Sequence, residues 1–296
     1  MEIQKQVLLA PYTSWQIGGP ADYFCAPKTL EELSSAVAEA KQKSWKVTVL
    51  GGGSNVLVSD EGVEGLVICL KKFSGLTSAV EGSDFIIEAF SGTGKNELLK
   101  TYLKNKLAPA LFLAGLPGDV GGGIVMNAGV SEKIEPREFG ELVDWIEVLR
   151  FDSLKVERVL AKDIRWHYRH SEGWQPGLVV KARLRWPYQQ ESDILNRVKA
   201  ANLNRLNKQP LDLPSCGSVF INPDGHKAAQ LIQESGMKGH RVGDAQVSTK
   251  HANFIVNLGA ATARDTLQVI QDVKDQVLRD KKVALKTEVV LLGRGF

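Results

Sequence analysis

The amino-acid sequence predicts an α+β protein with more than one domain, and three observations lead to this prediction. Segments with helical periodicity are interspersed with short β-rich runs, and neither an internal repeat nor a low-complexity linker interrupts them. The length of 296 residues is enough for two domains with substantial cores. Two glycine-rich loops are each joined to apolar runs, which indicates that the chain continues as strand after the glycines.

Composition and charge narrow the class of protein. The hydrophobic fraction of 43% and the charged fraction of 24% are ordinary for a soluble globular enzyme, and the net charge of +3 is too small to indicate a nucleic-acid partner. The N-terminus lacks the apolar core of a signal peptide, and no apolar run approaches ~18 residues, so we expect a cytoplasmic protein without a membrane partner. Cys25, Cys69 and Cys216 are widely spaced, which argues against disulfides and against a zinc site.

The first region predicts a helix and a strand that lead into the first glycine loop. Residues 29–43 carry an apolar stripe at helical spacing, and Thr29 with Glu32 forms a capping box. Residues 45–50 predict a strand that ends at Gly51-Gly52-Gly53. The runs that follow, 55–58 and 65–70, are β-rich, so this loop does not open a helix. By itself it is either a tight hairpin turn or a nest of backbone N–H groups that binds an anion.

A second loop of the same kind favours the anion-binding interpretation. Residues 114–123 contain five glycines and a proline, and an apolar run follows at 124–129. Two such loops indicate a long ligand whose pyrophosphate is held between strands. Neither loop matches the dinucleotide fingerprint that precedes a helix, and Gly92-Thr93-Gly94-Lys95 lacks the first glycine of a Walker A loop. We interpret Lys95 as a solvated residue near a helix start.

The remaining elements follow from the same periodicities. Strands are predicted at 85–89, 143–150, 155–160 and 178–186, and helices at 96–106 and 192–207. Past Pro210 and Pro214 the sequence predicts a helix at 227–234 that Gly236 can end, a strand at 251–258, a helix at 262–280 and a closing strand at 283–292. We place a domain boundary near residue 205.

Three segments carry groups that could act chemically. Residues 166–171 hold two histidines and an arginine, and this run is either part of a site or a sheet edge that faces water. Strand alternation would direct His167, Arg169 and Ser171 to the face opposite the other three residues. The two histidines are three residues apart, but no further ligand stands at helical spacing, so we expect no metal.

The other two segments contain Ser218 and Glu288. Gly217 allows close approach of the backbone to a ligand, and Ser218 is not part of a nucleophile elbow, so we interpret its hydroxyl as a donor of a proton or hydrogen bond. Cys216 has no base beside it in sequence and reads as a buried structural thiol. Glu288 stands in an apolar run, where a carboxylate is either at a strand edge or functional.

Five blocks of the chain together resemble the UDP-N-acetylenolpyruvoylglucosamine reductase family, flavoenzymes of bacterial peptidoglycan precursor synthesis. The blocks cover nearly the whole chain and stand in the family's order. They are TSWQIGGPADYF from Thr13, LGGGSNVLVSD from Leu50, AGLPGDVGGGIVMNAG from Ala114, NKQPLDLPSCGSVFINP from Asn207 and KGHRVGDAQVSTKHANFIVN from Lys238.

The resemblance implies a fold, a cofactor and a reaction. The fold is the FAD-binding fold of the vanillyl-alcohol-oxidase type, with FAD-binding subdomains at 1–72 and 73–204 and a C-terminal substrate-binding domain at 205–296. FAD is bound without a covalent link and NADPH is the co-substrate. Hydride passes from NADPH to FAD and then to the enolpyruvyl group of a UDP-sugar, giving UDP-N-acetylmuramate. Only a short segment separates Arg169 from the serine block, which resembles the family's shorter form, without a tyrosine loop.

The resemblance also implies the roles of particular residues. Arg169 matches the arginine that stabilises the substrate carboxylate, Glu288 its partner glutamate, and Ser218 the serine that protonates the carbon beside it. Candidates for binding the UDP-sugar are Tyr168, Arg205, Lys208 and Asn222. Candidates for binding FAD stand in the two glycine blocks and are Gly51, Gly52, Gly53, Ser54, Asn55, Gly115, Pro117, Gly118, Gly121, Gly122, Asn127 and Ala128.

The sequence departs from the family pattern at a few positions and leaves two other functions open. Ile221 stands where the family commonly has lysine, Lys286 where it often has an acidic residue, and Trp174 where phenylalanine is usual. A flavoenzyme of the same fold that oxidises alcohols is one alternative, and a non-catalytic FAD- or nucleotide-binding protein is another. The presence of Arg169, Ser218 and Glu288 together favours the reductase.

Overall fold

The computed structural model describes residues 1–130 and 134–296, and these form two compact units. The first unit consists of Met1–Ile3, Phe24–Gly52 and Gly65–Asn204. The second consists of Gln4–Tyr23, Gly53–Glu64 and Arg205–Phe296. Each unit is therefore assembled from three segments of the chain. The three domains expected from the resemblance remain a prediction.

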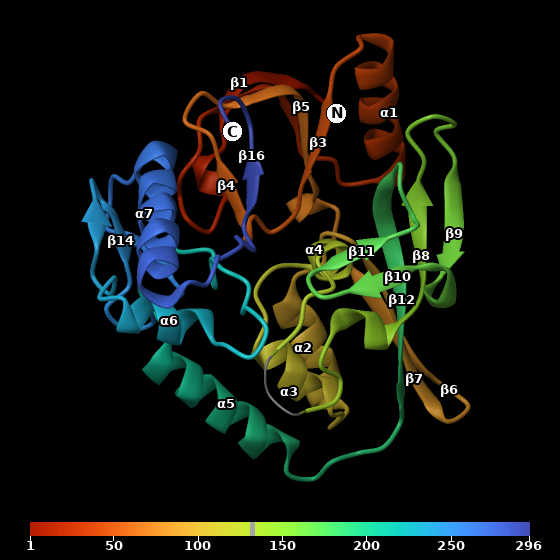
Figure 1. The fold of residues 1–296 in the computed structure, drawn as a ribbon. Helices are drawn as coiled ribbons and strands as arrows, with labels where there is room; N and C mark the ends of the chain where they lie inside the picture. Colours follow the sequence, from red (N-terminus) through yellow and green to blue (C-terminus); the bar gives the residue numbers. More distant parts are fainter. Residues whose placement is uncertain (131–133) are drawn as a thin grey trace. The chain divides into compact units, whose positions relative to one another are not determined.

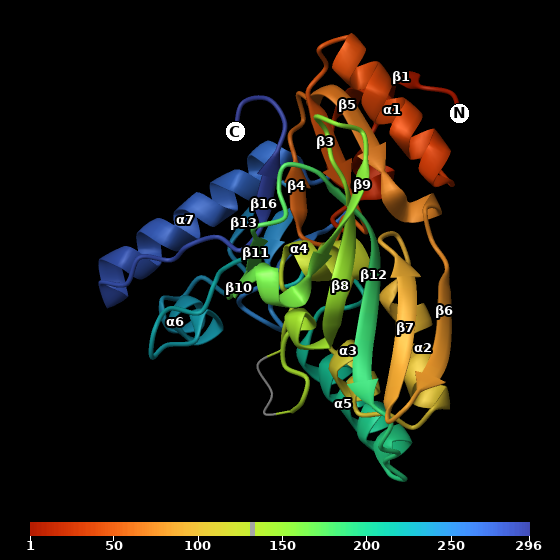
Figure 2. The same cartoon turned by 90° about the vertical axis from the view of Figure 1, so that its right-hand side faces the viewer.

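A five-stranded antiparallel sheet with the order β6-β7-β12-β8-β9 is the centre of the first unit (Figure 1 and Figure 2). Its strands are β6 Leu76–Glu81, β7 Asp84–Phe90, β8 Val143–Leu149, β9 Val156–Leu160 and β12 Leu178–Pro187. Strand β12 pairs with β7 on one side and β8 on the other, and its residues alternate, because Val180, Ala182 and Leu184 are buried while Lys181 and Arg183 form ion pairs with Glu88. Four of these strands confirm the sequence prediction.

Helices cover the apolar face of this sheet. They are α2 Lys95–Lys104, α3 Pro109–Ala114 and α4 Val120–Val125, and their buried residues share one hydrophobic core with the strands. Figure 2 shows α2 and α3 beside β7 and β12. Lys95 does lie at a helix start, as the sequence predicts, and it is partly buried there. The long helix α5 Ile194–Lys208 follows the sheet in sequence and confirms the helix predicted at 192–207.

The N-terminal elements agree with the sequence prediction. The helix is α1 Leu30–Gln42, with Thr29 as its N-cap, and the Thr29 hydroxyl accepts a hydrogen bond from the Glu32 N–H at 3.2 Å. Strand β3 Val47–Leu50 pairs in parallel with β5 Val63–Cys69, and the sheet order is β1-β2-β5-β3. The other two strands are β1 Gln4–Leu8 and β2 Pro20–Cys25.

The second glycine loop differs from the sequence prediction. Residues 120–125 form helix α4, whereas the sequence was expected to continue as a strand. Asp119 causes the difference, because its side chain accepts a hydrogen bond from the Gly122 N–H at 2.8 Å and caps the helix. Glycines have a low helix propensity, so periodicity alone gives no sign of this helix.

Residues 165–172 form a hairpin of β10 Arg165–His167 and β11 His170–Glu172. Tyr168 and Arg169 make the turn between its strands, so the predicted alternation through residues 166–171 is wrong. Trp166 is opposite Ser171, and His167 is opposite His170. The backbone of Arg169 is in the left-handed region, with φ of 57°. A turn of this type interrupts the alternation of a strand.

The second unit combines a three-stranded sheet with two helices around its own core. The sheet has the order β13-β14-β15, with β13 Arg241–Val242, β14 Ala245–Val247 and β15 Ile255–Asn257. The helices are α6 Ala228–Glu234 and α7 Ala263–Lys281, and Figure 1 shows α7 beside β14. Thr262 caps α7 in a capping box with Asp265, as its sequence indicates.

The end of the chain returns to a strand near its beginning. Strand β16 Val290–Leu292 pairs in parallel with β4 Val56–Val58. The strand predicted at 283–292 is therefore much shorter than expected, and Glu288 lies in the irregular segment before it. Similarly, the strand predicted at 251–258 is shorter in the structure, where only β15, Ile255–Asn257, is formed within that range. Apolar residues in both regions are buried without regular strand pairing.

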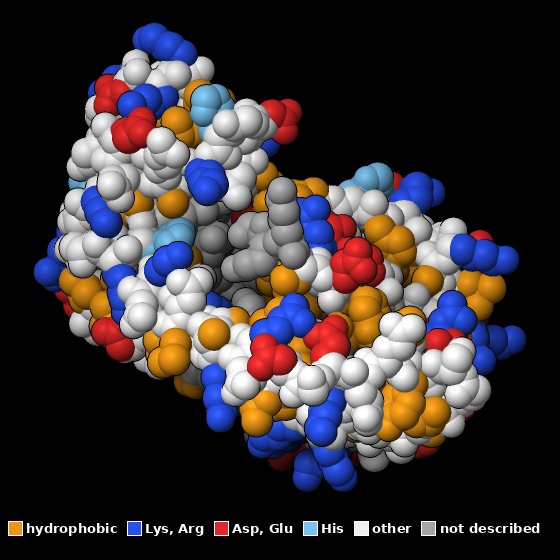
Figure 3. Space-filling model, turned by 90° about the horizontal axis from the view of Figure 1, so that it is seen from below, with side chains coloured by type: hydrophobic (Ala, Val, Ile, Leu, Met, Phe, Trp, Pro, Cys, Tyr) orange, Lys and Arg blue, Asp and Glu red, His pale blue; other side chains and the backbone are white. Residues whose placement is uncertain are grey.

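The surface carries charges of both signs. On the face in Figure 3, lysine and arginine side chains are interspersed with aspartate and glutamate side chains. This mixture agrees with the small net charge of +3. Among the helices of the described residues, none has the length and apolar character needed to cross a lipid bilayer.

Candidate active site

The two glycine loops meet within the first unit. A Cβ atom at Gly52 would lie 3.0 Å from the Gly118 Cα, and one at Gly51 would lie 2.7 Å from Oδ2 of Asp119. Side chains at these positions would therefore push the loops apart, so the contact depends on glycine. The structure thus brings Gly51, Gly52 and Gly118 together, three of the residues expected to bind FAD.

Asp119 lies between the two loops and was not assigned a role from the sequence. Its side chain is 5% exposed, and Oδ1 accepts the Gly122 N–H. Burial raises the pKa of this carboxyl group, and the N–H groups of Gly122 and Gly52 together with the charge of Lys71 offset this increase only in part. An aspartate can be an N-cap signal, but the three glycines that follow Asp119 have a low helix propensity and conceal this signal in the sequence.

The other FAD candidates differ in their surroundings. Gly115 and Pro117 belong to the second loop, and the Gly121 N–H donates to the Ser91 carbonyl at 2.7 Å. Gly122 is exposed and Ala128 half-buried. Gly53, Ser54 and Asn55 lie in the second unit.

The side chains of Asn55 and Asn127 contact the protein. Asn55 Nδ2 donates to the Glu288 carbonyl at 3.1 Å, and the Val290 N–H donates to the Asn55 carbonyl. Asn127 is fully buried and uses its amide group within the first unit. The Asn55 side chain thus supports the segment that carries Glu288, and the Asn127 side chain supports the β10–β11 hairpin.

Arg169 is held at the tip of the β10–β11 hairpin. Its Nη2 donates to the Gly129 carbonyl at 2.9 Å, and its guanidinium lies over the Tyr168 ring, 4.5 Å from the ring centre. Gly129 is the last residue of the second glycine block. A fixed cation is therefore presented beside the loop that the sequence assigns to FAD.

Ser218 and Glu288 lie on two extended segments that run antiparallel in the second unit. Phe220 is bridged to Thr287, and the Glu288 N–H donates to the Val219 carbonyl at 2.8 Å. Gly217 precedes Ser218 with φ of 85°, a conformation that favours glycine. The structure thus places two residues that are 70 positions apart in sequence on neighbouring segments.

Asn253 fixes the segment that carries Ser218, a role that the sequence did not reveal. Its Oδ1 accepts the Phe220 N–H and its Nδ2 donates to the Phe220 carbonyl, both at 2.9 Å, while the Val219 N–H donates to the Asn253 carbonyl. The asparagine is 4% exposed. The sequence sign of this role is that Asn253 is a polar residue within the apolar run of the fifth block.

Cys216 is inert, as its sequence context indicates. Its side chain is buried, and burial together with the nearby charge of Glu288 raises the pKa of its thiol well above the ordinary value. A thiol that does not ionise is a poor nucleophile. The reactive groups predicted from the sequence in this region remain the hydroxyl of Ser218 and the carboxyl group of Glu288.

The candidates for UDP-sugar binding are distributed over both units. Arg205 and Lys208 lie in the last turn of α5, where Arg205 Nε donates to Gln209 Oε1 at 3.3 Å. Asn222 Oδ1 accepts the N–H of Ala228, the first residue of α6, at 3.0 Å. Tyr168 is 50% exposed at the hairpin tip.

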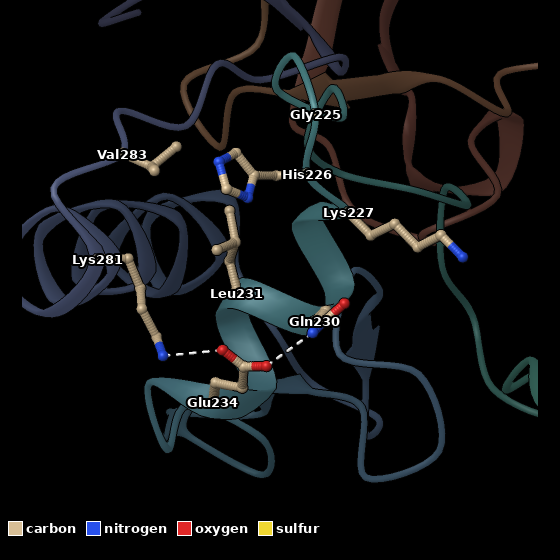
Figure 4. Close-up of a pocket in the computed structure, with 8 residues that line it drawn as sticks. All are labelled: Gly225, His226, Lys227, Gln230, Leu231, Glu234, Lys281 and Val283. Carbon is tan, nitrogen blue, oxygen red and sulfur yellow. Dashed lines mark hydrogen bonds and ion pairs between the residues drawn. The ribbon is translucent and has the colours of Figure 1, made fainter.

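A shallow hollow of about 450 Å³ lies in the second unit and contains none of the predicted site residues. Figure 4 shows Lys281 and Gln230 directed at Glu234 across it, and both contacts measure 2.8 Å. Lys281 and Glu234 thus form an ion pair at this hollow. Among the described residues, no cluster of three or more histidine, cysteine, aspartate or glutamate side chains could hold a metal ion.

Family comparisons match both parts of the chain. Residues 21–153 match the model of an FAD-binding domain, and residues 209–292 match that of the C-terminal domain of UDP-N-acetylenolpyruvoylglucosamine reductase. Curated proteins with that enzyme's name are similar over nearly the full length. The one from Prochlorococcus marinus strain MIT 9313 is 40% identical, covering 98% of this chain and 93% of its own, and that from Gloeobacter violaceus is 39% identical, covering 100% and 98%.

A solved structure is similar to the whole chain. It is the crystal structure of the enzyme of the same name from Thermus caldophilus, with a TM-score of 0.78, 32% identity and coverage of 99% of each chain. Together with the FAD-binding-domain match, it confirms the α+β class and the flavin-binding fold that the resemblance implied.

Proposed function

The chain belongs to the UDP-N-acetylenolpyruvoylglucosamine reductase family, and on this basis we propose that it reduces UDP-N-acetylglucosamine enolpyruvate to UDP-N-acetylmuramate with NADPH. It is an FAD-containing oxidoreductase of peptidoglycan precursor synthesis. The reaction adds one hydride and one proton across the enolpyruvyl double bond, and it oxidises NADPH to NADP⁺. We expect it to take place in the cytoplasm.

The residues of the first unit fit FAD. The Gly51–Gly52 turn lies against Gly118, and a Cβ atom at either position of the first loop would collide with the second. Two adjoining glycine turns offer backbone N–H groups to a pyrophosphate without side chains in the way. We propose that the FAD candidates of the first unit, Gly51 and Gly52 together with those of the 114–129 block, hold the cofactor in this manner. When bound, FAD accepts hydride from NADPH and delivers it to the substrate.

Arg169 and Glu288 would bind the substrate carboxylate. Hydride addition at the terminal enol-ether carbon places negative charge on that carboxylate, and a fixed cation stabilises the charge where it develops. The Gly129 carbonyl holds the Arg169 guanidinium in place for this purpose. A protonated Glu288 could donate a hydrogen bond to the same group, and the half-buried position of Glu288 is compatible with this.

Ser218 would supply the proton. A serine hydroxyl is a weak acid, but the enolate-like carbon beside the carboxylate is a strong acceptor, so transfer is feasible. Gly217 gives this segment the conformational freedom for close approach to a ligand. Tyr168, Arg205, Lys208 and Asn222 are proposed to contact the UDP-sugar, and Asn222 Oδ1 also accepts the Ala228 N–H.

The observation that supports this function most strongly is the pairing of Ser218 and Glu288 on adjacent segments, in a chain that also presents Arg169 on a structured turn. An anaerobic titration tests it. Purified holoprotein should lose its flavin absorbance with NADPH and recover it with UDP-N-acetylglucosamine enolpyruvate. Loss without recovery would contradict the substrate assignment and leave the flavin assignment intact.

A further inference from the structure

The hairpin that carries Arg169 is attached to the end of the second glycine block at several points. Asn127 Nδ2 donates to the His167 carbonyl at 3.0 Å, and the Gly129 carbonyl accepts from Arg169. On the other strand, the Ser171 hydroxyl donates to the Val125 carbonyl at 3.3 Å. The residues that hold the hairpin therefore belong to the 114–129 block, which the sequence assigns to FAD.

The side chain of Asn127 is buried and has no N–H donor to spare for a ligand. Its Nδ2 also donates to Glu138 Oε2 at 2.7 Å, and its Oδ1 accepts the Gly140 N–H at 3.0 Å. The side chain is 0% exposed, and its backbone has a positive φ of 37°. An asparagine amide has two N–H donors, and both are used here.

We infer that Asn127 is a positioning residue for Arg169, rather than a residue whose side chain contacts FAD. This inference rests on the proposed role of Arg169. Asn127 joins its own segment to two others. Its amide binds the Glu138 side chain and the Gly140 N–H on one segment, and the His167 carbonyl, two residues before Arg169, on the other.

The position of the hairpin would depend on this amide. Without it, the His167 carbonyl and the half-buried Gly140 N–H lose this side-chain partner, while the Gly129–Arg169 contact remains. A catalytic group displaced by 1 Å can lower the rate about 10²-fold. The effect should be confined to the step in which Arg169 acts.

Asn127→Ala in the full-length holoprotein tests the inference through three measurements. We expect flavin reoxidation by UDP-N-acetylglucosamine enolpyruvate to slow about 10- to 100-fold, with flavin reduction by NADPH and the Kd for FAD within about twofold of wild type. Amide hydrogen exchange of the peptide containing residues 165–172 should accelerate. Asn105→Ala is the matched control, because it removes one amide hydrogen bond, to the Thr101 carbonyl, elsewhere in the same unit.

A second variant covers the case in which Asn127→Ala fails to fold. In Gly129→Ala, the new Cβ would lie 2.8 Å from Nη1 of Arg169 and 2.8 Å from the Arg137 carbonyl oxygen, so the guanidinium must shift together with the backbone beside it, while the Asn127 side chain itself is unchanged. The same selective loss of reoxidation is expected. Combining Asn127→Ala with Arg169→Lys should slow reoxidation by much less than the product of the two separate effects.

The outcomes separate failure of this inference from failure of the proposed function. Loss of FAD affinity in Asn127→Ala, or unchanged exchange of residues 165–172, would overturn the positioning role. If Arg169→Lys reoxidises at the wild-type rate, the proposed role of Arg169 is wrong, and the positioning role, which rests on it, falls with it. Accelerated exchange with selective loss of reoxidation supports both.

Discussion

At the scale of single residues, the proton donor is the assignment with the clearest kinetic test. Ser218→Ala removes the hydroxyl and leaves the backbone contacts of Val219 and Phe220 with Asn253 in place. We expect the variant to bind FAD and to be reduced by NADPH normally, and its reoxidation by the enolpyruvyl sugar to slow about 10²–10³-fold. Stopped-flow absorbance of the flavin measures both half-reactions.

Ser215→Ala is the matched control for this variant. Ser215 lies three residues earlier, and its bridge to Val256 involves the backbone. It should reoxidise at nearly the wild-type rate. A wild-type rate in Ser218→Ala as well would show that another group supplies the proton.

Asn253 offers a stability test at the same scale. Asn253→Ala removes two buried hydrogen bonds to Phe220 and leaves its N–H and carbonyl without side-chain partners. We expect the free energy of unfolding to fall by about 2–4 kcal/mol, which denaturant titration can measure. Asn196→Ala, which removes an exposed bond to Asp193, should cost under about 1 kcal/mol, and similar losses in the two variants would contradict the prediction.

The role of a residue can be predicted from the sequence where the signal is local, and the family resemblance supplies further predictions at the positions that match. Cys216 could be judged inert because no base adjoins it, and burial confirms this. The supporting roles of Asn127 and Asn253 could not be predicted. Asn127 binds a backbone group 40 residues away in sequence, and Asn253 binds one 33 residues away. A single sequence does not show which backbone groups a fold brings together.

At the scale of elements, the cap of α4 links stability to pH. Burial raises the pKa of Asp119 above its unfolded value of about 4, so the native state holds the proton more tightly than the unfolded state. Stability is therefore greatest below the unfolded pKa and declines as pH rises through the folded pKa. Asp119→Asn keeps a capping oxygen for Gly122 and does not titrate.

We therefore expect Asp119→Asn to be more stable than wild type at neutral pH, and the difference to shrink toward zero near pH 4. Thermal melting of the apoprotein between pH 4 and pH 8 measures this. Asp224→Asn, at an exposed position, serves as the control. A difference that grows toward acid pH would show that Asp119 is stabilising as a carboxylate.

Elements were predictable where caps and periodicity agree, as in α1, α7 and the strands of the large sheet. Prediction failed where another force decided the structure. Helix α4 contains three glycines, and Asp119 caps its N-terminus. Glu288 lies outside β16, because the segment that contains it pairs with residues 219–221 through isolated hydrogen bonds. Neither interaction produces a periodic pattern of apolar residues in the sequence.

At the scale of the whole molecule, the flavin should stabilise the fold by mass action. At 100 times its Kd, FAD adds about 2.7 kcal/mol to the free energy of unfolding, which corresponds to a rise in melting temperature of roughly 5–10 °C. Riboflavin, which lacks the pyrophosphate, should give a smaller rise at the same concentration. Equal shifts would contradict the assignment of the glycine loops to the pyrophosphate.

The parallel pairing of β4 with β16 has a consequence for synthesis on the ribosome. All segments of the first unit have been translated once Asn204 is added, but the second unit also needs residues 205–296. At bacterial rates this interval is about 5–20 s, during which residues 4–23 and 53–64 lack the part of the chain that completes their unit. Early in the life of each molecule, the segment after the first glycine loop thus lacks its partner strand, and it remains unpaired on that side until β16 has been synthesised.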